Sequence, residues 1–176
     1  MAIDPERPFK PINIAVLTVS DTRTPETDTS GDILADRVRA AGHNLAARTI
    51  VKDDAKVLAA QFITWIDDPA IDAVVSTGGT GLTGRDVTPE ALALIEGARE
   101  IPGFGELFRW LSYQSIGTST VQSRACAVVA RGTYIFALPG SNGAVKDGWD
   151  GILAEQLDSR NRPCNFVELM PRLKEK

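Results

Sequence analysis

Residues 71–86 read I-D-A-V-V-S-T-G-G-T-G-L-T-G-R-D, a short apolar run that leads into a glycine-rich loop and an acid. The β-branched run is typical of a strand buried in a parallel sheet. Gly78, Gly79, Gly81 and Gly84 can take positive φ, and they let backbone N–H groups come close to an anion. The loop therefore predicts a phosphate site, and the alternative is a merely tight turn.

The helix that follows this loop has a start signal of its own. Thr88 is the expected N-cap, and Pro89 takes the first helical position, where the missing N–H is not needed. Asp86 is then free to bind a metal, although a hydrogen bond within the loop is the alternative. Residues 79–86 come close to a Walker A loop, but Arg85 replaces its lysine and the helix begins later. We therefore expect a different phosphate loop.

Strand and helix patterns alternate through the first half of the chain. They are expected in this order: a strand at 12–20, a helix capped by Ser30, a strand at 45–51, a helix capped by Asp53 or Asp54, a strand at 71–77 and the helix after Thr88. This order is typical of a parallel sheet with helices on its faces. Residues 125–130 and 133–138 flank Arg131-Gly132 and predict a hairpin, so the α/β fold should have a mostly parallel sheet with an antiparallel hairpin.

The composition favours one domain that binds a small partner. The chain has 176 residues, 43% of them hydrophobic, which suits a single domain at 12–176 after an extended arm at 1–11 that is disordered or laid over a neighbour. The net charge of -4, without a basic cluster, argues against nucleic acid. The sequence shows no signal peptide and no membrane span, so a cytoplasmic protein is expected.

The two cysteines and the single histidine do not predict a metal centre. Cys126 stands in an apolar run and is expected to pack in the core, and the role of Cys164 stays open. His43 follows Gly42 at the end of a helical pattern and is expected to be solvated. Zinc catalysis and histidine-based proton transfer are therefore not expected.

Residues 101–114 predict a helix with apolar groups around much of its surface. Phe104, Leu107, Phe108 and Leu111 share one face, whereas Trp110 and Tyr113 fall elsewhere. Burial on two sides would follow, and we expect part of this helix to form a subunit interface; simple core packing is the alternative.

Pro139-Gly140-Ser141-Asn142-Gly143 forms a second loop before a helix. The inward stripe of this helix is expected to hold Val145, Trp149, Ile152, Leu153 and Gln156. A helix N-terminus suits an anion, although the loop alone reads as an ordinary turn. Ligands of open α/β sheets gather at the carboxyl ends of strands, so the loops after Ser20, Val51, Thr77 and Leu138 should converge on one pocket. Asp21, Asp53 and Asp86 would lie there.

Several ordered motifs together resemble the MoaB/MogA family of molybdenum cofactor biosynthesis proteins. They are T-V-S-D (18–21), S-T-G-G-T-G (76–81), R-D-V-T-P-E-A (85–91), P-G-F-G-E (102–106), S-R (123–124) and L-P-G (138–140). I-G-T-S-T-V-Q-S-R-A (116–125) and R-P-C-N-F (162–166) are closer to the MoaB branch. The resemblance implies a three-layer α/β/α molybdopterin-binding domain, usually a homotrimer, with MoaB members often forming hexamers.

The resemblance also implies a reaction. The terminal phosphate of molybdopterin attacks the α-phosphate of ATP, and pyrophosphate leaves. Two acids serve this Mg²⁺-dependent step in the family. One matches Asp86, and the other matches Asp53, although Asp54 stands beside it. The two would be both catalytic and metal-binding, whereas helix capping is the alternative for Asp53. Such a reaction depends mainly on positioning and charge, so it needs no histidine.

The remaining candidate residues would bind substrate or nucleotide. They are Ser20, Asp21, Thr77, Gly78, Gly79, Thr80, Gly81, Ser123, Pro139, Gly140 and Ser141. Asp21 has the alternative role of ordering its loop, and Arg124 either contacts a phosphate or pairs with an acid across an interface. Two other functions stay open: a protein that binds molybdopterin without adenylylating it, and a CinA-type protein that acts on pyridine nucleotides, whose extra domain 176 residues do not accommodate.

Overall fold

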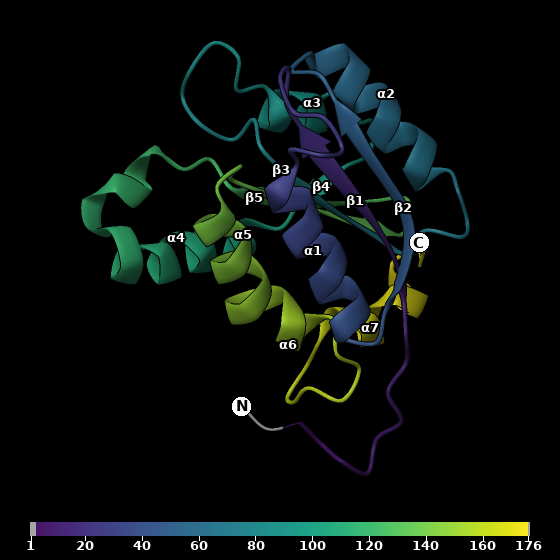
Figure 1. Ribbon diagram of the computed structural model, residues 1–176. Helices are drawn as coiled ribbons and strands as arrows, with labels where there is room; N and C mark the ends of the chain where they lie inside the picture. Colours follow the sequence, from purple (N-terminus) through teal and green to yellow (C-terminus); the bar gives the residue numbers. More distant parts are fainter. Residues whose placement is uncertain (1–2, 176) are drawn as a thin grey trace.

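A mixed six-stranded sheet forms the centre of the computed structural model, which describes residues 3–175 (Figure 1). The strands are β1 (Asn13–Val19), β2 (Asn44–Val51), β3 (Ala73–Thr77), β4 (Arg99–Glu100), β5 (Cys126–Ala130) and β6 (Thr133–Leu138). Their order in the sheet is β2-β1-β3-β6-β5-β4. The four strands β2, β1, β3 and β6 are parallel to one another. Strand β5 is antiparallel to β6, and β4 is antiparallel to β5. The expected mixed sheet and its hairpin are confirmed.

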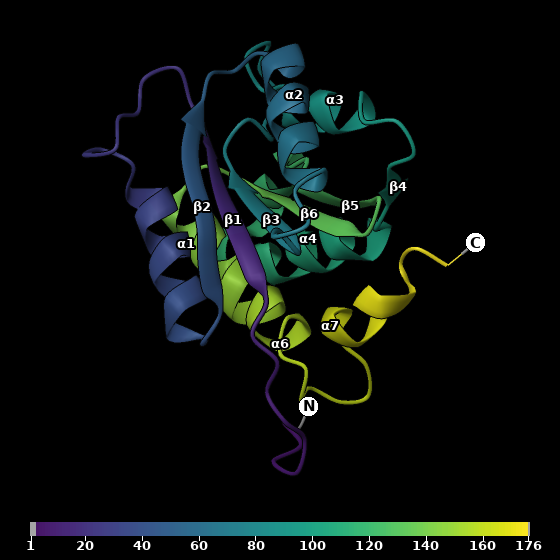
Figure 2. The same ribbon diagram turned by 90° about the vertical axis from the view of Figure 1, so that its right-hand side faces the viewer.

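Helices cover both faces of this sheet (Figure 2). The α-helices are α1 (Thr29–Ala40), α2 (Ala55–Ile66), α3 (Thr88–Ala93), α4 (Pro102–Ile116), α5 (Asn142–Gly148), α6 (Ala154–Gln156) and α7 (Phe166–Leu169). A π-helical turn, Trp149–Leu153, joins α5 to α6, and 3-10 turns span Gly117–Gln122 and Met170–Arg172. The result is the expected three-layer arrangement.

Two apolar clusters hold the layers together. One packs α1, α4 and α5 against the first face of the sheet, through residues such as Leu34, Phe108 and Trp149. The other packs α2 and α3 against the opposite face, through residues such as Phe62 and Leu92. The strands alternate their side chains between these clusters, as a strand buried on both faces must. In the inward stripe of the α5–α6 segment, Gln156 is only partly buried and Leu157 is buried instead.

The chain changes direction at the centre of the sheet. From β1 it runs through α1 to β2, and it then returns through α2 to β3 on the other side of β1. The loops after β1 and β3 therefore leave adjacent parallel strands toward opposite layers. Such a switch point opens a crevice at the carboxyl ends of the strands, where α/β proteins bind ligands.

Two helix caps settle which acids are structural. Asp28, rather than the expected Ser30, caps α1 by accepting a hydrogen bond from the Gly31 amide. Its carboxylate is fully buried. It also accepts a hydrogen bond from Thr18 and pairs with Arg48, and these contacts offset the cost of burying the charge. Asp54 caps α2, accepting from the amides of the second and third helical residues at 2.9 and 3.0 Å. Asp53 is therefore not the cap.

The arm before β1 lies against the C-terminal segment of the same chain. The Asp4 amide donates to the carbonyl of Arg160, and the Lys10 amide donates to Ser159. Phe9 packs on the ring of His43, whose Nδ1 accepts a hydrogen bond from the Ile12 amide. The expectation of a solvated His43 is wrong, because this packing leaves it only 6% exposed, and burial lowers its pKa. Residues 1 and 2 of the arm lie outside the described residues.

The helix α4 is buried along one side and apolar along the other. Phe104 and Phe108 are in the core as expected, whereas Leu107 is 42% exposed. The side chains of Trp110, Tyr113 and Ile116 are more exposed still, each by more than half. None of the helices in the described part of the chain is long and apolar enough to cross a membrane.

Candidate functional site

The ends of four parallel strands meet at one edge of the sheet, and hydrogen bonds link the loops that follow them. The Ser20 amide, after β1, donates to the Val51 carbonyl at the end of β2. The Gly78 amide, after β3, donates to the Leu138 carbonyl at the end of β6. The loops after the four strands therefore lie at one edge of the sheet as predicted, whereas a single pocket shared by all four stays a prediction.

Backbone crowding explains the first two glycines of the loop after β3. Gly78 has φ +101°, and a Cβ there would lie 2.3 Å from the Val19 carbonyl oxygen. Gly79 has φ +66°, and its Cβ would lie 2.4 Å from the Thr88 hydroxyl. Gly81 and Gly84 do not have positive φ, contrary to expectation. Gly81 is instead crowded by the carboxylate of Asp86, whereas Gly84 is open.

The second glycine loop packs directly against the first. A Cβ on Gly140 would lie 3.3 Å from the Cα of Gly78. Thr77 donates its hydroxyl to the Pro139 carbonyl, so this side chain joins the loops and does not face a ligand. The two loops thus form one continuous backbone surface at the switch point, and that surface can approach an anion closely.

The threonines of the first loop have different surroundings. Thr88 lies inside α3 and donates its hydroxyl to the Gly78 carbonyl, so the expectation that it caps the helix is wrong; Val87 holds the N-cap position without a side-chain bond. Thr80 is 2% exposed, and its hydroxyl has no hydrogen-bond partner among the described residues. A buried hydroxyl without a partner is unfavourable unless a ligand or water satisfies it.

Three acids surround the loops. Asp21 accepts a hydrogen bond from the Asp53 amide and forms an ion pair with Arg85. Asp86 accepts hydrogen bonds from the amide and hydroxyl of Thr83 at 2.8 and 2.7 Å, both on Oδ2. The carboxylate of Asp86 therefore makes the hydrogen bonds within the loop that are the alternative to a metal role, and its metal role stays a prediction.

These acids titrate differently because their surroundings differ. Burial raises the pKa of Asp53, and the negative charges of Asp21 and Asp86 raise it further. The Arg85 guanidinium lowers the pKa of Asp21. Burial pushes the pKa of Asp86 up, but the hydrogen bonds from Thr83 and the Gly81 amide bring it below its ordinary value. Asp53 is thus the acid in this group that gains most from a nearby cation.

A metal at this position would not have a cage made only of protein. Among residues 3–175, no three His, Cys, Asp or Glu side chains are grouped to hold an ion. Two carboxylates together with phosphate oxygens and water are the ligands typical of Mg²⁺. The side chains present therefore suit a cation that arrives with a phosphate ligand.

The serines among the candidate residues make local hydrogen bonds. Ser20 accepts from the amides of Thr22 and Arg23. Ser141 caps α5 by accepting from the Ala144 amide, and Ser123 accepts from the Ala125 amide. These side chains therefore shape the loops.

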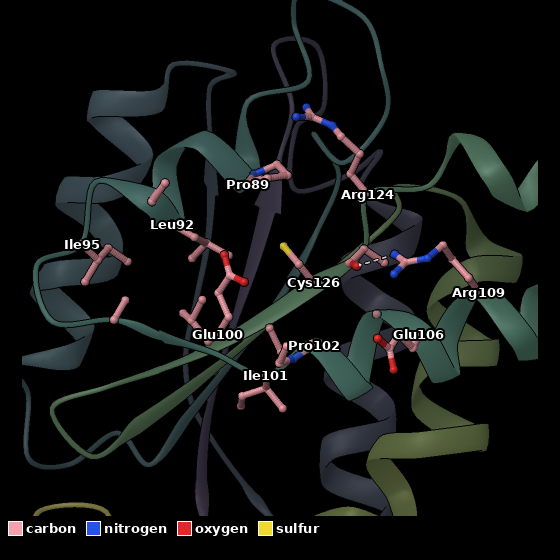
Figure 3. A pocket seen from close by; sticks show the side chains of 16 residues that line it. Pro89, Leu92, Ile95, Glu100, Ile101, Pro102, Glu106, Arg109, Arg124 and Cys126 are labelled. Atoms are coloured by element: carbon pink, nitrogen blue, oxygen red, sulfur yellow. Dashed lines mark hydrogen bonds between the residues drawn. The ribbon is translucent and has the colours of Figure 1, made fainter.

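A cavity of about 540 Å³ lies between α3 and α4, next to the glycine loop (Figure 3). Apolar residues such as Leu92 line it, together with the carboxylates of Glu100 and Glu106 and the guanidinium groups of Arg109 and Arg124. Cys126 points into it, and burial raises the pKa of this thiol to about 11, so it stays protonated and unreactive at neutral pH. Cys164 is exposed.

Two residues in the site are not apparent from spacing alone. In the sequence Arg85 stands out only because it replaces the Walker A lysine, whereas in the structure it is the ion-pair partner of Asp21. Arg124 pairs with Glu90 of its own chain and donates to two carbonyls of the glycine loop. Its S-R motif drew attention to it, but no local pattern indicates that it reaches a loop some 40 residues away in the sequence.

Comparisons with known proteins agree over most of the chain. Residues 15–159 match the family described as a probable molybdopterin binding domain. Molybdenum cofactor biosynthesis protein B of Escherichia coli (strain K12) is 51% identical over 158 residues, which cover 90% of this chain and 92% of that protein. The protein of the same name from Bacillus subtilis (strain 168) is 44% identical over 147 residues, 83% of this chain and 86% of that protein. A crystal structure of molybdenum cofactor biosynthesis protein B has a TM-score of 0.83 and 37% identity, covering 95% of this chain and 98% of that one.

The coupling among the three acids gives a first prediction. Asp21→Asn should lower the pKa of Asp53, because it removes a neighbouring negative charge and releases Arg85. Carboxyl-carbon NMR titration of both proteins measures this. Asp36→Asn, which changes an exposed acid on α1, is the control and should leave Asp53 unchanged. An Asp53 pKa that stays constant or rises in Asp21→Asn would contradict the assigned coupling.

Proposed function

The chain belongs to the MoaB/MogA family of molybdenum cofactor biosynthesis proteins, and we propose that it binds molybdopterin and adenylylates it with Mg-ATP. The observation that carries the proposal is the joint surface of the two glycine loops, beside which Asp53 and Asp86 lie. Gly78 and Gly140 approach within the reach of one phosphate chain, and Thr80 brings a buried hydroxyl that has no partner within residues 3–175. A site for an oxyanion ligand accounts for these features together.

The residues present fit a magnesium ion and a nucleotide. Asp53 and Asp86 would hold the ion. Burial and the acidic neighbours, Asp86 among them, raise the pKa of Asp53, so a cation between the two carboxylates would relieve their repulsion. The backbone amides of Gly79 to Gly81 and of the loop at Gly140 would bind phosphate oxygens. When bound, Mg²⁺ would neutralise negative charge on the phosphates as pyrophosphate departs.

The chain itself contributes position and electrostatics. A phosphate oxygen of molybdopterin forms a bond to the α-phosphorus of ATP, while the bond from that phosphorus to the bridging oxygen of the β-phosphate breaks. Pyrophosphate carries away the electron pair, so no oxidant or reductant takes part. The loops hold the two phosphate groups in line and exclude water from the α-phosphorus, which is most of what this type of transfer requires.

The cavity between α3 and α4 suits the ring system of the pterin. It adjoins the glycine loop at Arg124 and is large enough for a ligand of that size. Its apolar residues would stack on a flat ring, and Glu100 or Glu106 could accept hydrogen bonds from amino groups. We assign the pterin ring to this cavity and its phosphate to the glycine loop.

Incubation with molybdopterin and Mg-ATP tests the activity directly. The wild-type protein should release pyrophosphate and form adenylylated pterin, as measured by chromatography and a coupled pyrophosphate assay. Asp86→Asn should reduce turnover by at least about 100-fold, because it removes a charge on which phosphate transfer depends. Pterin binding, followed by fluorescence, should survive in this variant.

The outcomes separate the two candidate functions. Asp36→Asn is the control and should retain full turnover. Pterin binding without any product in the wild type would reject adenylylation and support a protein that only binds molybdopterin. Full turnover in Asp86→Asn would reject the metal role of Asp86.

We also propose that the outer face of α4 joins copies of the chain into a trimer or hexamer. Leu107, Trp110, Tyr113 and Ile116 recur every third residue and expose an apolar ridge, which the adjacent Val121 extends. Trp110 is 62% exposed, and large exposed aromatic residues are typical of interface centres. A free monomer would leave this ridge in water.

Trp110→Glu should break this assembly, because it places a charge at the centre of an apolar contact. Sedimentation velocity at micromolar concentration should find a trimer or hexamer for the wild type and a smaller species for this variant. Val57→Glu, at a 52% exposed position on α2, is the matched control and should leave the assembly intact. A wild-type monomer, or an unchanged assembly in Trp110→Glu, would contradict the assigned interface.

A further inference from the structure

Arg124 holds the glycine loop from behind. Its Nε donates to the Gly81 carbonyl at 2.7 Å, and its Nη2 donates to the Asp86 carbonyl at 2.6 Å. Its own backbone amide donates to the Thr80 carbonyl at 2.9 Å. Three of the carbonyls in the loop that carries Asp86 are therefore held by one residue, which lies just before β5 at the same edge of the sheet.

The guanidinium group is itself fixed at its third nitrogen. Nη1 forms an ion pair with Glu90, which lies in the first turn of α3, directly after the loop. The planar fork of arginine reaches two carbonyls and one carboxylate at once, which the single ammonium group of lysine does not do. Glu90, Arg124 and the loop thus form a closed ring of contacts around residues 80–90.

The side chain also borders the cavity on its other side, as Figure 3 shows. Arg124 is therefore the wall between the cavity and the glycine loop. Its N–H groups donate to carbonyls of the loop and to Glu90, so these contacts stabilise the conformation of the loop.

We propose that Arg124 is a positioning residue that sets the place of Asp86 and of the Thr80–Gly81 peptide relative to the second glycine loop. The expected effect of Arg124 on turnover rests on the proposed function. The effect of Arg124 on the loop does not depend on any activity. Glu90 acts through Arg124 by orienting the guanidinium group.

Amide hydrogen exchange tests the positioning role without an assay of activity. Arg124→Lys retains the charge but loses the fork that holds the loop carbonyls. The amides of Thr83 and Asp86, which are hydrogen-bonded within the loop, should then exchange at least about tenfold faster, because the loop opens more often. Glu90→Gln should accelerate the same amides less. Arg131→Lys, which alters an exposed ion pair with Asp67 at the other end of β5, is the matched control and should change nothing in the loop.

Turnover at varied Mg²⁺ gives a second readout that a merely structural role would not move. Arg124→Lys should lower kcat and weaken the apparent Mg²⁺ affinity, and high Mg²⁺ should restore part of kcat, because a displaced Asp86 still binds when the ion is in excess. A loss of kcat that Mg²⁺ does not relieve would reject the link to Asp86.

The exchange pattern separates failure of this inference from failure of the proposed function. Unchanged exchange at Thr83 and Asp86 in Arg124→Lys would overturn the positioning role. Acceleration spread over the whole sheet would overturn it as well, because it would indicate general destabilisation. If the wild type makes no product, adenylylation fails, and the exchange result still decides whether Arg124 positions the loop.

Discussion

The close approach of the loops after β3 and β6 is the constraint on which the site depends. The Gly78 amide is hydrogen-bonded to the Leu138 carbonyl, and a Cβ on Gly140 would lie 3.3 Å from the Gly78 Cα. This contact is possible because β3 and β6 are parallel neighbours whose carboxyl ends coincide. A side chain at Gly78 would meet the Val19 carbonyl of β1, so the same glycine also fixes how near the loop lies to the switch point.

The chemistry follows from this backbone arrangement more than from any reactive side chain. The site brings together amides, the buried hydroxyl of Thr80, which has no partner in the described part of the chain, and three acids, of which Asp21 is neutralised by Arg85. Asp53 and Asp86 differ in pKa because Thr83 stabilises the charged form of Asp86, whereas Asp53 is partly buried near other negative charges. Such a site suits phosphate groups, and its excess of negative charge suits a cation. The function proposed for the chain uses these properties only.

Features encoded in neighbouring residues could be predicted from the sequence, and features set by distant contacts could not. The strand at 73–77, the hairpin and the glycine loop follow from local patterns of β-branched residues and glycine. Local sequence does not indicate that Asp28 caps α1, because its position depends on hydrogen bonds with Thr18 and Arg48, which belong to β1 and β2. His43 is buried by Phe9, which lies 34 positions earlier in the chain and is placed there by the fold. The bonds from Arg124 to Gly81 and Asp86 span 43 and 38 positions, and no spacing rule reaches that far.

The central claim is that the two glycine loops act as one phosphate-binding surface, and amide NMR shifts measured during a titration with Mg-ATP test it most directly. The amides of Gly78, Gly79, Gly81 and Gly140 should shift together with a single dissociation constant, while Gly132, in the β5–β6 turn, should not respond. Binding detected by calorimetry without any shift at these glycines, or with separate constants for the two loops, would contradict it.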